Sequence, residues 1–304
     1  MDRVTHGFVI SAPRSGSTWL MRALSAHPHV HATEHRLFGP HHDEVIDEGA
    51  DRPRLRITLD RFADAHARHL NLDGTGLDIP GAREALIRRF ADALLKFDRA
   101  AAAKPVIIDK VTPYPGTASN VFDRLTGVFP NAPVVGLVRD GRDVVTSGAH
   151  HWLNKRLAGE GPATAPTADR FLDDEIVRSW ATLWDECTAA ALRAPTRIRY
   201  ESMLDDMPAV LEGVFRALGV PAAAGEIDAC VAAGSFERAS GGRARGVHNA
   251  LAHARSGVRG DWRRVFTRRD GEVFDAVAGE TLESLGYADR GWWRTLPETL
   301  RQTA

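Results

Sequence analysis

The first segment with a chemical signature is the loop Pro13–Thr18, which reads Pro-Arg-Ser-Gly-Ser-Thr. A small-residue loop that enters a helix presents free backbone N–H groups and the positive end of the helix dipole, which together bind anions. Gly16 allows a close approach of the backbone, Ser17 and Thr18 add hydroxyl donors, and Arg14 adds charge. The G-x-x-x-x-G-K-[ST] spacing of a Walker A loop is absent. The alternative is an ordinary turn in which a hydroxyl side chain caps the helix.

A second candidate anion site is Arg139–Asp143 together with Ser147, directly after the apolar run Val134–Val138. Ligands of open α/β folds bind beyond the carboxyl ends of the strands. Arg139 would lie at such an end, with Ser147 in the following helix, so the two could hold a second phosphate. The alternative is a salt-bridged surface loop, because the two aspartates of this segment can neutralise its arginines.

The third segment is Arg255–Trp262, which reads Arg-Ser-Gly-Val-Arg-Gly-Asp-Trp. It lies at the end of the stretch Gly234–Gly260, which contains six glycines, many arginines and little apolar periodicity. A long basic stretch of this kind could close over a ligand. The alternative is an exposed basic turn.

Short apolar runs that alternate with amphipathic stretches must position these three segments. The pattern predicts strands at Gly7–Ala12, Val106–Ile108, Val134–Val138 and Arg197–Tyr200, and helices at Thr18–His27, about 59–70, Ala82–Ala102 and Met203–Leu218. This alternation is typical of an α/β, three-layer fold with a central, mostly parallel sheet and helices on both faces. We interpret residues 1–304 as a single domain with loop insertions at about 35–83, 155–169 and 234–260.

The composition excludes several classes of protein. With 43% hydrophobic and 26% charged residues, the 304-residue chain is typical of a soluble globular protein. Lys and Arg number 39 against 40 Asp and Glu, so no global field would hold nucleic acid or an anionic membrane. The only two cysteines, Cys187 and Cys230, indicate reduced thiols. No secretion leader or transmembrane run is found, so we expect a cytoplasmic protein without a membrane span. The sequence does not indicate an oligomeric state.

Taken in order, the three segments resemble those of the sulfotransferases that use 3′-phosphoadenosine 5′-phosphosulfate (PAPS). The first resembles the 5′-phosphosulfate loop of that family, P-[KR]-S-G-[ST]-T-x-[LW]. The second resembles the 3′-phosphate motif, an Arg at a strand end with a Ser eight positions later, as Arg139 and Ser147 are here. The third resembles the R-x-G-x-x-G-D-W segment over the 3′-phosphate. The resemblance covers residues from about 7 to 265, and the first loop looks closer to the tyrosylprotein branch and its bacterial relatives.

The resemblance implies that the α/β fold is P-loop-like and that PAPS is the co-substrate, and it assigns the residues that bind PAPS. The 5′-phosphosulfate would be held by Arg14, Ser15, Gly16, Ser17 and Thr18, the adenine approached by Trp19 and Tyr200, and the 3′-phosphate held by Arg139, Ser147, Arg255 and Gly257. Core aromatic residues are the alternative for Trp19 and Tyr200. The family often has Lys where this chain has Ser256, so one charged contact is absent or comes from another arginine, with Arg243, Arg245 and Arg259 as candidates.

The catalytic residues implied by the resemblance are Arg14, Lys110 and a base. Arg14 and the loop amides would stabilise charge, as would Lys110, which stands where the family has a Lys near the transferring group. An ion pair with Asp109 or another carboxylate is the alternative for Lys110. Glu34 and His35 are the candidates for the base, and we favour Glu34. The base of the cytosolic branch is absent, since its position holds Thr112.

The sequence therefore predicts a sulfotransferase that moves a sulfuryl group from PAPS to a hydroxyl, or as second choice an amine. The acceptor would be a small molecule, a glycolipid or a carrier-bound metabolite. No metal is required, because side-chain cations take its place. A small-molecule kinase or other P-loop nucleotide enzyme is one alternative, and a non-catalytic nucleotide-binding relative is another.

Overall fold

A single parallel sheet organises the chain. The computed structural model describes residues 6–34, 82–113, 118–159, 166, 171–244, 246 and 257–299. Five parallel strands lie in the order β2-β3-β1-β4-β5. Their bounds are β1 His6–Ser11, β2 Val30–Glu34, β3 Val106–Val111, β4 Val134–Val138 and β5 Thr196–Arg199. The predicted α/β fold with a parallel sheet is confirmed.

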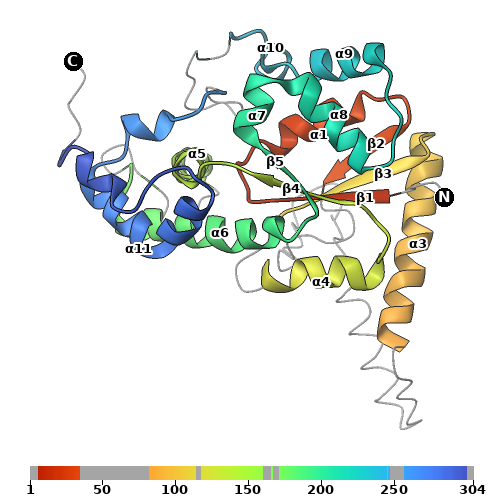
Figure 1. Cartoon of the computed structure of the whole chain (residues 1–304), viewed down its shortest axis with the longest axis horizontal. Helices are drawn as coiled ribbons and strands as arrows, with labels where there is room; N and C mark the ends of the chain where they lie inside the picture. Colours follow the sequence, from red (N-terminus) through yellow and green to blue (C-terminus); the bar gives the residue numbers. More distant parts are fainter. Residues whose placement is uncertain are drawn as a thin grey trace.

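Helices cover both faces of this sheet, which gives three layers (Figure 1). The α-helices are α1 Ser17–Ser25, α3 Ala82–Ala102, α4 Ala118–Val128, α5 Gly141–Leu157, α6 Asp174–Leu192, α7 Tyr200–Asp205, α8 Met207–Ala217, α9 Ala224–Ala233, α10 Phe236–Ala239 and α11 Arg268–Ser284. Two short 3₁₀ helices are η1 Asp261–Arg264 and η2 Trp292–Thr295. Helices α1, α8 and α9 pack on one face, and α3, α4 and α6 on the other, while α5, α6 and α11 enclose a third core.

The central strand β1 shows why the sheet is buried on both faces. Phe8 and Ile10 are fully buried in the core beneath α3 and α4, whereas Val9 between them is fully buried in the core beneath α1 and α8. Successive side chains of a strand point to opposite faces, so a continuous apolar run suits a strand that is covered twice. Burial of each such side chain contributes about 1.5–3 kcal/mol.

Strand β2 was not predicted from the sequence. It pairs only with β3 and therefore lies at an edge of the sheet. Of its five residues only Val30 is buried, so its sequence lacks the apolar run that revealed the inner strands. Edge strands need less apolar surface than central ones, which explains why the pattern failed here.

Two predicted boundaries are also corrected. Tyr200 does not end β5 but begins α7. The helix predicted over Met203–Leu218 is two helices, because Asp206 has φ −151° and ψ 79° and its side chain accepts the N–H of Ala209 to cap α8. The helix predicted at Ala82–Ala102 is confirmed as α3. The one predicted at about 59–70 lies outside the described residues, as do most residues of the predicted loop insertions.

The parallel arrangement brings the carboxyl ends of all five strands to one edge of the sheet. The loop after β1 begins at Ala12, and β2 ends at Glu34. Lys110 is the penultimate residue of β3, Arg139 directly follows β4 and Tyr200 directly follows β5. Segments far apart in the sequence therefore meet where α/β folds bind their ligands.

The packing of α5 on α6 depends on glycine. A Cβ atom added at Gly148 would lie 2.3 Å from the ring of Trp180, whereas one added at Gly127 of α4 would meet nothing within 4 Å. We therefore expect Gly148→Ala to lower the free energy of unfolding by about 1–3 kcal/mol through overpacking. Gly127→Ala, the matched control, should raise it by about 0.5–1 kcal/mol because alanine favours the helix. Urea unfolding followed by circular dichroism measures both, and equal effects would contradict the packing argument.

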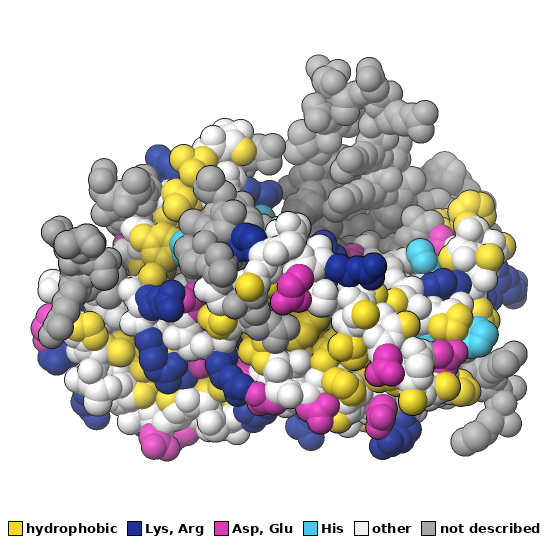
Figure 2. All heavy atoms as spheres, turned by 90° about the horizontal axis from the view of Figure 1, so that it is seen from above, with side chains coloured by type: hydrophobic (Ala, Val, Ile, Leu, Met, Phe, Trp, Pro, Cys, Tyr) yellow, Lys and Arg dark blue, Asp and Glu magenta, His cyan; other side chains and the backbone are white. Residues whose placement is uncertain are grey.

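The described surface carries both signs of charge. Figure 2 shows Lys and Arg interspersed with Asp and Glu over the face that it presents. This distribution accords with the net charge of −1 for the whole chain. In the described part of the chain, no helix combines the length and apolarity needed to cross a bilayer.

Candidate functional site

The loop between β1 and α1 forms a cradle of backbone donors. Arg14 and Gly16 both have positive φ, 65° and 89°, which turns the chain sharply from the strand into the helix. Gly16 is the N-cap of α1, and no side chain caps the first turn. An uncapped helix N-terminus has N–H groups available for an anion. The alternative, a turn capped by a hydroxyl side chain, is thus wrong, and the anion-cradle interpretation is favoured.

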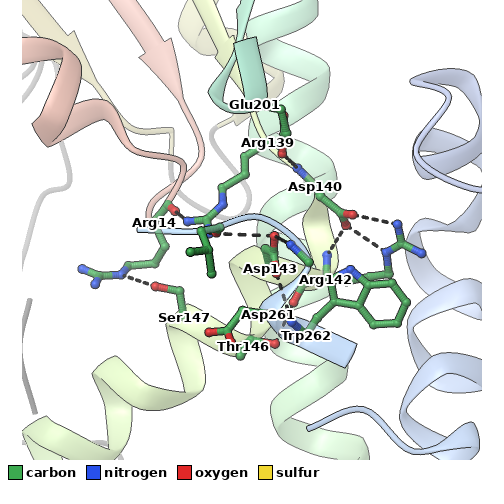
Figure 3. Close-up of polar contacts among 12 residues, drawn as sticks. Arg14, Arg139, Asp140, Arg142, Asp143, Thr146, Ser147, Glu201, Asp261 and Trp262 are labelled. Atoms are coloured by element: carbon green, nitrogen blue, oxygen red, sulfur yellow. Dashed lines mark hydrogen bonds and ion pairs between the residues drawn. The ribbon is translucent and has the colours of Figure 1, made fainter. Parts of the chain in front are cut away.

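Arg139 joins this loop to the second predicted segment (Figure 3). Its Nη1 donates to the carbonyl oxygen of Arg14 at 2.9 Å. The Nε of Arg14 in turn donates to the Oγ of Ser147 at 3.2 Å. Three residues predicted to contact the two ends of one nucleotide therefore lie in direct contact with one another, although more than 120 positions separate Arg14 from Arg139 (|i−j| = 125).

Arg139 is a buried cation with one N–H group, that of Nε, that has no hydrogen-bond partner among the described residues. Its exposed fraction is 7%. The nearest carboxylate oxygen, Oδ2 of Asp143, is 3.9 Å from Nη2. Burial alone would lower the pKa of Arg139, but Tyr200 and the surrounding carboxylates raise it, so the guanidinium stays charged. The Oγ of Ser15 is likewise buried without a partner in the described ranges. Such groups fit a site built for a phosphate.

The third predicted segment contacts the second through Arg139. The carbonyl oxygen of Val258 accepts from Nη2 of Arg139 at 3.3 Å. Gly257 has φ 68°, and a Cβ there would lie 2.5 Å from the ring of Phe236, so only glycine fits this turn. Arg255 and Ser256 lie outside the described residues. Of the arginines considered as substitutes near the 3′-phosphate, Arg259 instead forms an exposed ion pair with Asp205.

Tyr200 lies between the loop and the buried arginine. The guanidinium carbon of Arg139 stands 4.1 Å from the centre of its ring, a cation–π contact. Trp19 meets the same ring edge to face at 5.7 Å and is partly buried against the α1 core. A Cβ atom at Gly16 would lie 2.4 Å from Tyr200. The ring of Tyr200 thus packs against the loop at Gly16. A contact of either aromatic ring with adenine stays a prediction.

Lys110 and Glu34 are brought together by strand register. Glu34 of β2 pairs with Lys110 of β3, and Nζ of Lys110 donates to Oε2 of Glu34 at 3.2 Å. The side chain of Lys110 is 9% exposed and that of Glu34 is 38% exposed, so the carboxylate faces outward. Asp109 instead accepts the hydroxyl of Thr33 at 3.0 Å. The alternative given for Lys110, an ion pair with a carboxylate, is thus found, with Glu34 as the partner. A catalytic role for Lys110 stays a prediction.

The predicted site residues are distributed as follows. Arg14, Ser15 and Gly16 form the first loop, Ser17, Thr18 and Trp19 the first turn of α1, Glu34 the end of β2, Lys110 the end of β3, Arg139 the start of the loop after β4, Ser147 the second turn of α5, Tyr200 the start of α7 and Gly257 the turn before η1. His35, like Arg255, lies outside the described residues.

The sequence indicated that the two aspartates of the second predicted segment could neutralise its arginines, but not which pairs with which. Asp140 forms an ion pair with Arg142 at 2.7 Å and not with Arg139. Glu201 was not predicted at all, yet it accepts the N–H of Asp140 at 3.1 Å and the hydroxyl of Tyr287 at 2.8 Å. The signal available for Glu201 was an acid in the first turn of a helix beside Tyr200.

The cradle makes a specific prediction for Gly16→Ala. We expect it to lower nucleotide affinity by about tenfold or more, because a methyl group adds strain at positive φ and pushes the loop away from Tyr200. Gly286→Ala is the matched control, since its φ is 69° and a Cβ there meets nothing within 4 Å. Both variants should lose about 1–2 kcal/mol of stability, but only the first should lose affinity in calorimetry. Unchanged affinity in Gly16→Ala would argue against the cradle.

An uncapped helix N-terminus and a buried arginine at the carboxyl edge of a parallel sheet are typical of α/β proteins that bind phosphorylated ligands. The family model described as Sulfotransferase family matches residues 8–224. The chain belongs to the sulfotransferase family, and the family predicted from the motifs is confirmed. The match includes the first two motifs and ends before the third.

Individual relatives are distant. Sulfotransferase 2A1 of Rattus norvegicus is 25% identical over 169 residues, which cover 50% of this chain and 57% of the rat protein. Sulfotransferase 2A2 of Mus musculus is 25% identical over 169 residues, covering 50% of this chain and 56% of the mouse protein. The match thus spans little more than half the length of these curated relatives.

Solved structures share the fold. Mouse sulfotransferase SULT7A1 complexed with PAP has a TM-score of 0.55 at 14% identity, covering 96% of this chain and 88% of that one. Retinol dehydratase in a complex with retinol and PAP has a TM-score of 0.50 at 18% identity, covering 93% and 82%. At such identities the likeness concerns the fold alone.

Proposed function

We propose that this protein transfers a sulfuryl group from PAPS to an acceptor hydroxyl, with an amine as second choice. The observation that carries the proposal is the pair of hydrogen bonds that joins Arg139, Arg14 and Ser147. These contacts link a backbone cradle for one phosphate to a buried cation for another. A nucleotide with phosphates at both its 3′ and 5′ positions would match two such sites.

The chain's own groups suit a 3′,5′-bisphosphorylated nucleotide. The backbone of Arg14–Thr18 and the hydroxyls of the first turn of α1 would hold the 5′ group. Arg139 and Ser147 would hold the 3′-phosphate, together with Arg255 and the backbone of Gly257. Trp19 and Tyr200 would approach the adenine.

The transfer itself needs cations where charge develops. PAPS supplies the sulfuryl group and a phosphate leaving group. In our proposal Lys110 and Arg14 stabilise the negative charge on the oxygen that leaves, as preorganised donors do in phosphoryl transfer. The low exposure of Lys110 keeps water from screening that charge. These side-chain cations take the place of a metal, so we expect EDTA to leave turnover unchanged.

Glu34 would accept the proton of the acceptor. Its carboxylate is the more exposed partner of the pair with Lys110, so an incoming hydroxyl can reach it. His35 is the second candidate. The acceptor would be a small molecule, a glycolipid or a carrier-bound metabolite, and the protein would work in the cytoplasm.

Calorimetric titration with 3′-phosphoadenosine 5′-phosphate tests the proposal without a known acceptor. We expect micromolar affinity, about −8 kcal/mol, with 5′-AMP binding much more weakly. ATP with Mg²⁺ is titrated in a parallel experiment. Clear binding of ATP with none of the bisphosphate would overturn the proposal in favour of a kinase. Bisphosphate binding without transfer to any acceptor in a broad screen would favour a non-catalytic relative.

A further inference from the structure

Asp143 is a fully buried carboxylate beside the site. It lies in the first turn of α5, and both its oxygens accept backbone N–H groups from a remote part of the chain. Oδ2 accepts from Gly260 at 2.7 Å, and Oδ1 accepts from Trp262 at 3.0 Å (Figure 3). The family resemblance assigned no role to this residue.

These bonds replace a missing helix cap. Gly260 is the N-cap of η1, but it has no side chain to cap the helix. Asp143 therefore satisfies the N–H groups at the start of η1 from another element, across 117 and 119 positions of the sequence. A carboxylate at a helix N-terminus is a strong partner, since the bonds are charge-assisted.

Two further contacts hold the segment Gly257–Trp262, one from Arg139 just after β4 and one from the first turn of α5. Nη2 of Arg139 donates to the carbonyl oxygen of Val258, and the guanidinium carbon of Arg142 lies 4.1 Å from the ring centre of Trp262. Arg139 and the first turn of α5 thus hold this segment beside the buried arginine.

The two hydrogen bonds from Gly260 and Trp262 depend on the ionisation of Asp143. Burial raises the pKa of the carboxyl, while Arg139 and the two backbone N–H groups oppose that rise. A protonated carboxyl would lose one acceptor, so both bonds together require the carboxylate. Asp143 and Arg139 form an ion pair at 3.9 Å, which is too long for a hydrogen bond. The Nε of Arg139 has no hydrogen-bond partner among the described residues and can donate to an anion.

We infer that Asp143 is a positioning residue that fixes the segment Gly257–Trp262 against Arg139 and thereby confers preference for a 3′-phosphorylated nucleotide. The inference rests on the proposed function. Asp143 touches neither the sulfuryl group nor the acceptor in this account, and it acts through the backbone of Gly260 and Trp262.

Asp143→Asn tests the inference, with Asp270→Asn as the matched control. Asparagine keeps the size of the side chain, but its NH₂ group cannot accept the second N–H. Asp270 is also a buried acid whose oxygen accepts a backbone N–H, that of Thr267 at 2.8 Å, but in α11 and away from Arg139. Both variants should lose stability, so stability alone does not distinguish a positioning role from a structural one.

Two readouts make the distinction. In Asp143→Asn we expect faster hydrogen exchange in the peptide 257–264. We also expect a loss of about 10–100-fold in affinity for 3′-phosphoadenosine 5′-phosphate, with 5′-AMP affinity changed less than about threefold. Asp270→Asn should change neither the exchange of this peptide nor the ratio of the two affinities.

The outcomes separate the inference from the proposed function. If the unmodified protein binds no bisphosphate, the proposed function fails and the inference fails with it. If it binds the bisphosphate, but Asp143→Asn keeps the wild-type ratio of affinities or the wild-type exchange, only the inference is overturned. An equal loss of affinity for both nucleotides would also overturn it.

Discussion

We expect Glu34→Gln to lower kcat for sulfuryl transfer by about 10²–10⁴-fold, and affinity for the bisphosphate nucleotide to stay within about threefold of wild type. The expected loss follows because an amide cannot take the proton of the acceptor hydroxyl. The amide oxygen can still accept the hydrogen bond from Lys110, and the side chain is 38% exposed, so the fold should be kept. Release of 3′-phosphoadenosine 5′-phosphate, followed over a panel of hydroxyl acceptors, measures the rate.

Two control variants make this result specific. Glu226 has a comparable exposed fraction of 33% and also lies near a basic side chain, with 3.6 Å between its Oε2 and Nε2 of His27. Glu226→Gln should therefore leave kcat unchanged. His35→Asn should also keep wild-type turnover if Glu34 is the base. Full activity in Glu34→Gln together with a large loss in His35→Asn would reverse the assignment, and full activity in both would remove both candidates.

Arg139→Ala should weaken binding of 3′-phosphoadenosine 5′-phosphate by about 100-fold or more, and of 5′-AMP by less than about tenfold. Hydrogen bonds to charged groups contribute about 1.5–3 kcal/mol each, which sets this scale. Only the bisphosphate has a 3′ group to lose its partner. The smaller effect on 5′-AMP follows because Nη1 of Arg139 also holds the carbonyl of Arg14 in the first loop. Calorimetry with both nucleotides measures the two losses.

Arg193→Ala is the control for the loss of one positive charge. Arg193 forms an exposed ion pair with Asp123 at 2.5 Å, far from the carboxyl edge of the sheet, and its removal should not change either affinity. Arg139→Lys keeps the charge but not the planar fork, so its bisphosphate affinity should fall between wild type and Arg139→Ala. If Arg139→Ala weakens both nucleotides equally, Arg139 does not bind the 3′-phosphate.

The inner strands of the sheet could be predicted because helices cover them on both faces. A continuous apolar run predicts a central strand, as at Phe8, Val9 and Ile10 of β1. The apolar runs of β3 and β4 predict central strands in the same way. Strand β2 could not be found in this way, because an edge strand with one buried residue lacks that pattern. The short break at Asp206 was missed because it depends on a single cap.

The site was predictable where a local motif contains the chemistry. The small-residue loop around Gly16 determines its own backbone, since strand, turn and helix are neighbours in the chain. The order of the three motifs indicated the family before any geometry was known. The choice of partner for Lys110 was left open, because strand register, which pairs it with Glu34, depends on a strand that the sequence did not show.

The sequence by itself determined the elements, the family and the residue types that meet a nucleotide, because these follow from local periodicity and short motifs. Only the tertiary structure decided which carboxylate pairs with which arginine or backbone N–H group. Asp140 pairs with Arg142, while both oxygens of Asp143 accept hydrogen bonds from the backbone of Gly260 and Trp262 and none from Arg139. The physical reason is that hydrogen-bond partners are chosen by distance and direction across elements more than 100 positions apart, and no spacing in the sequence contains that information.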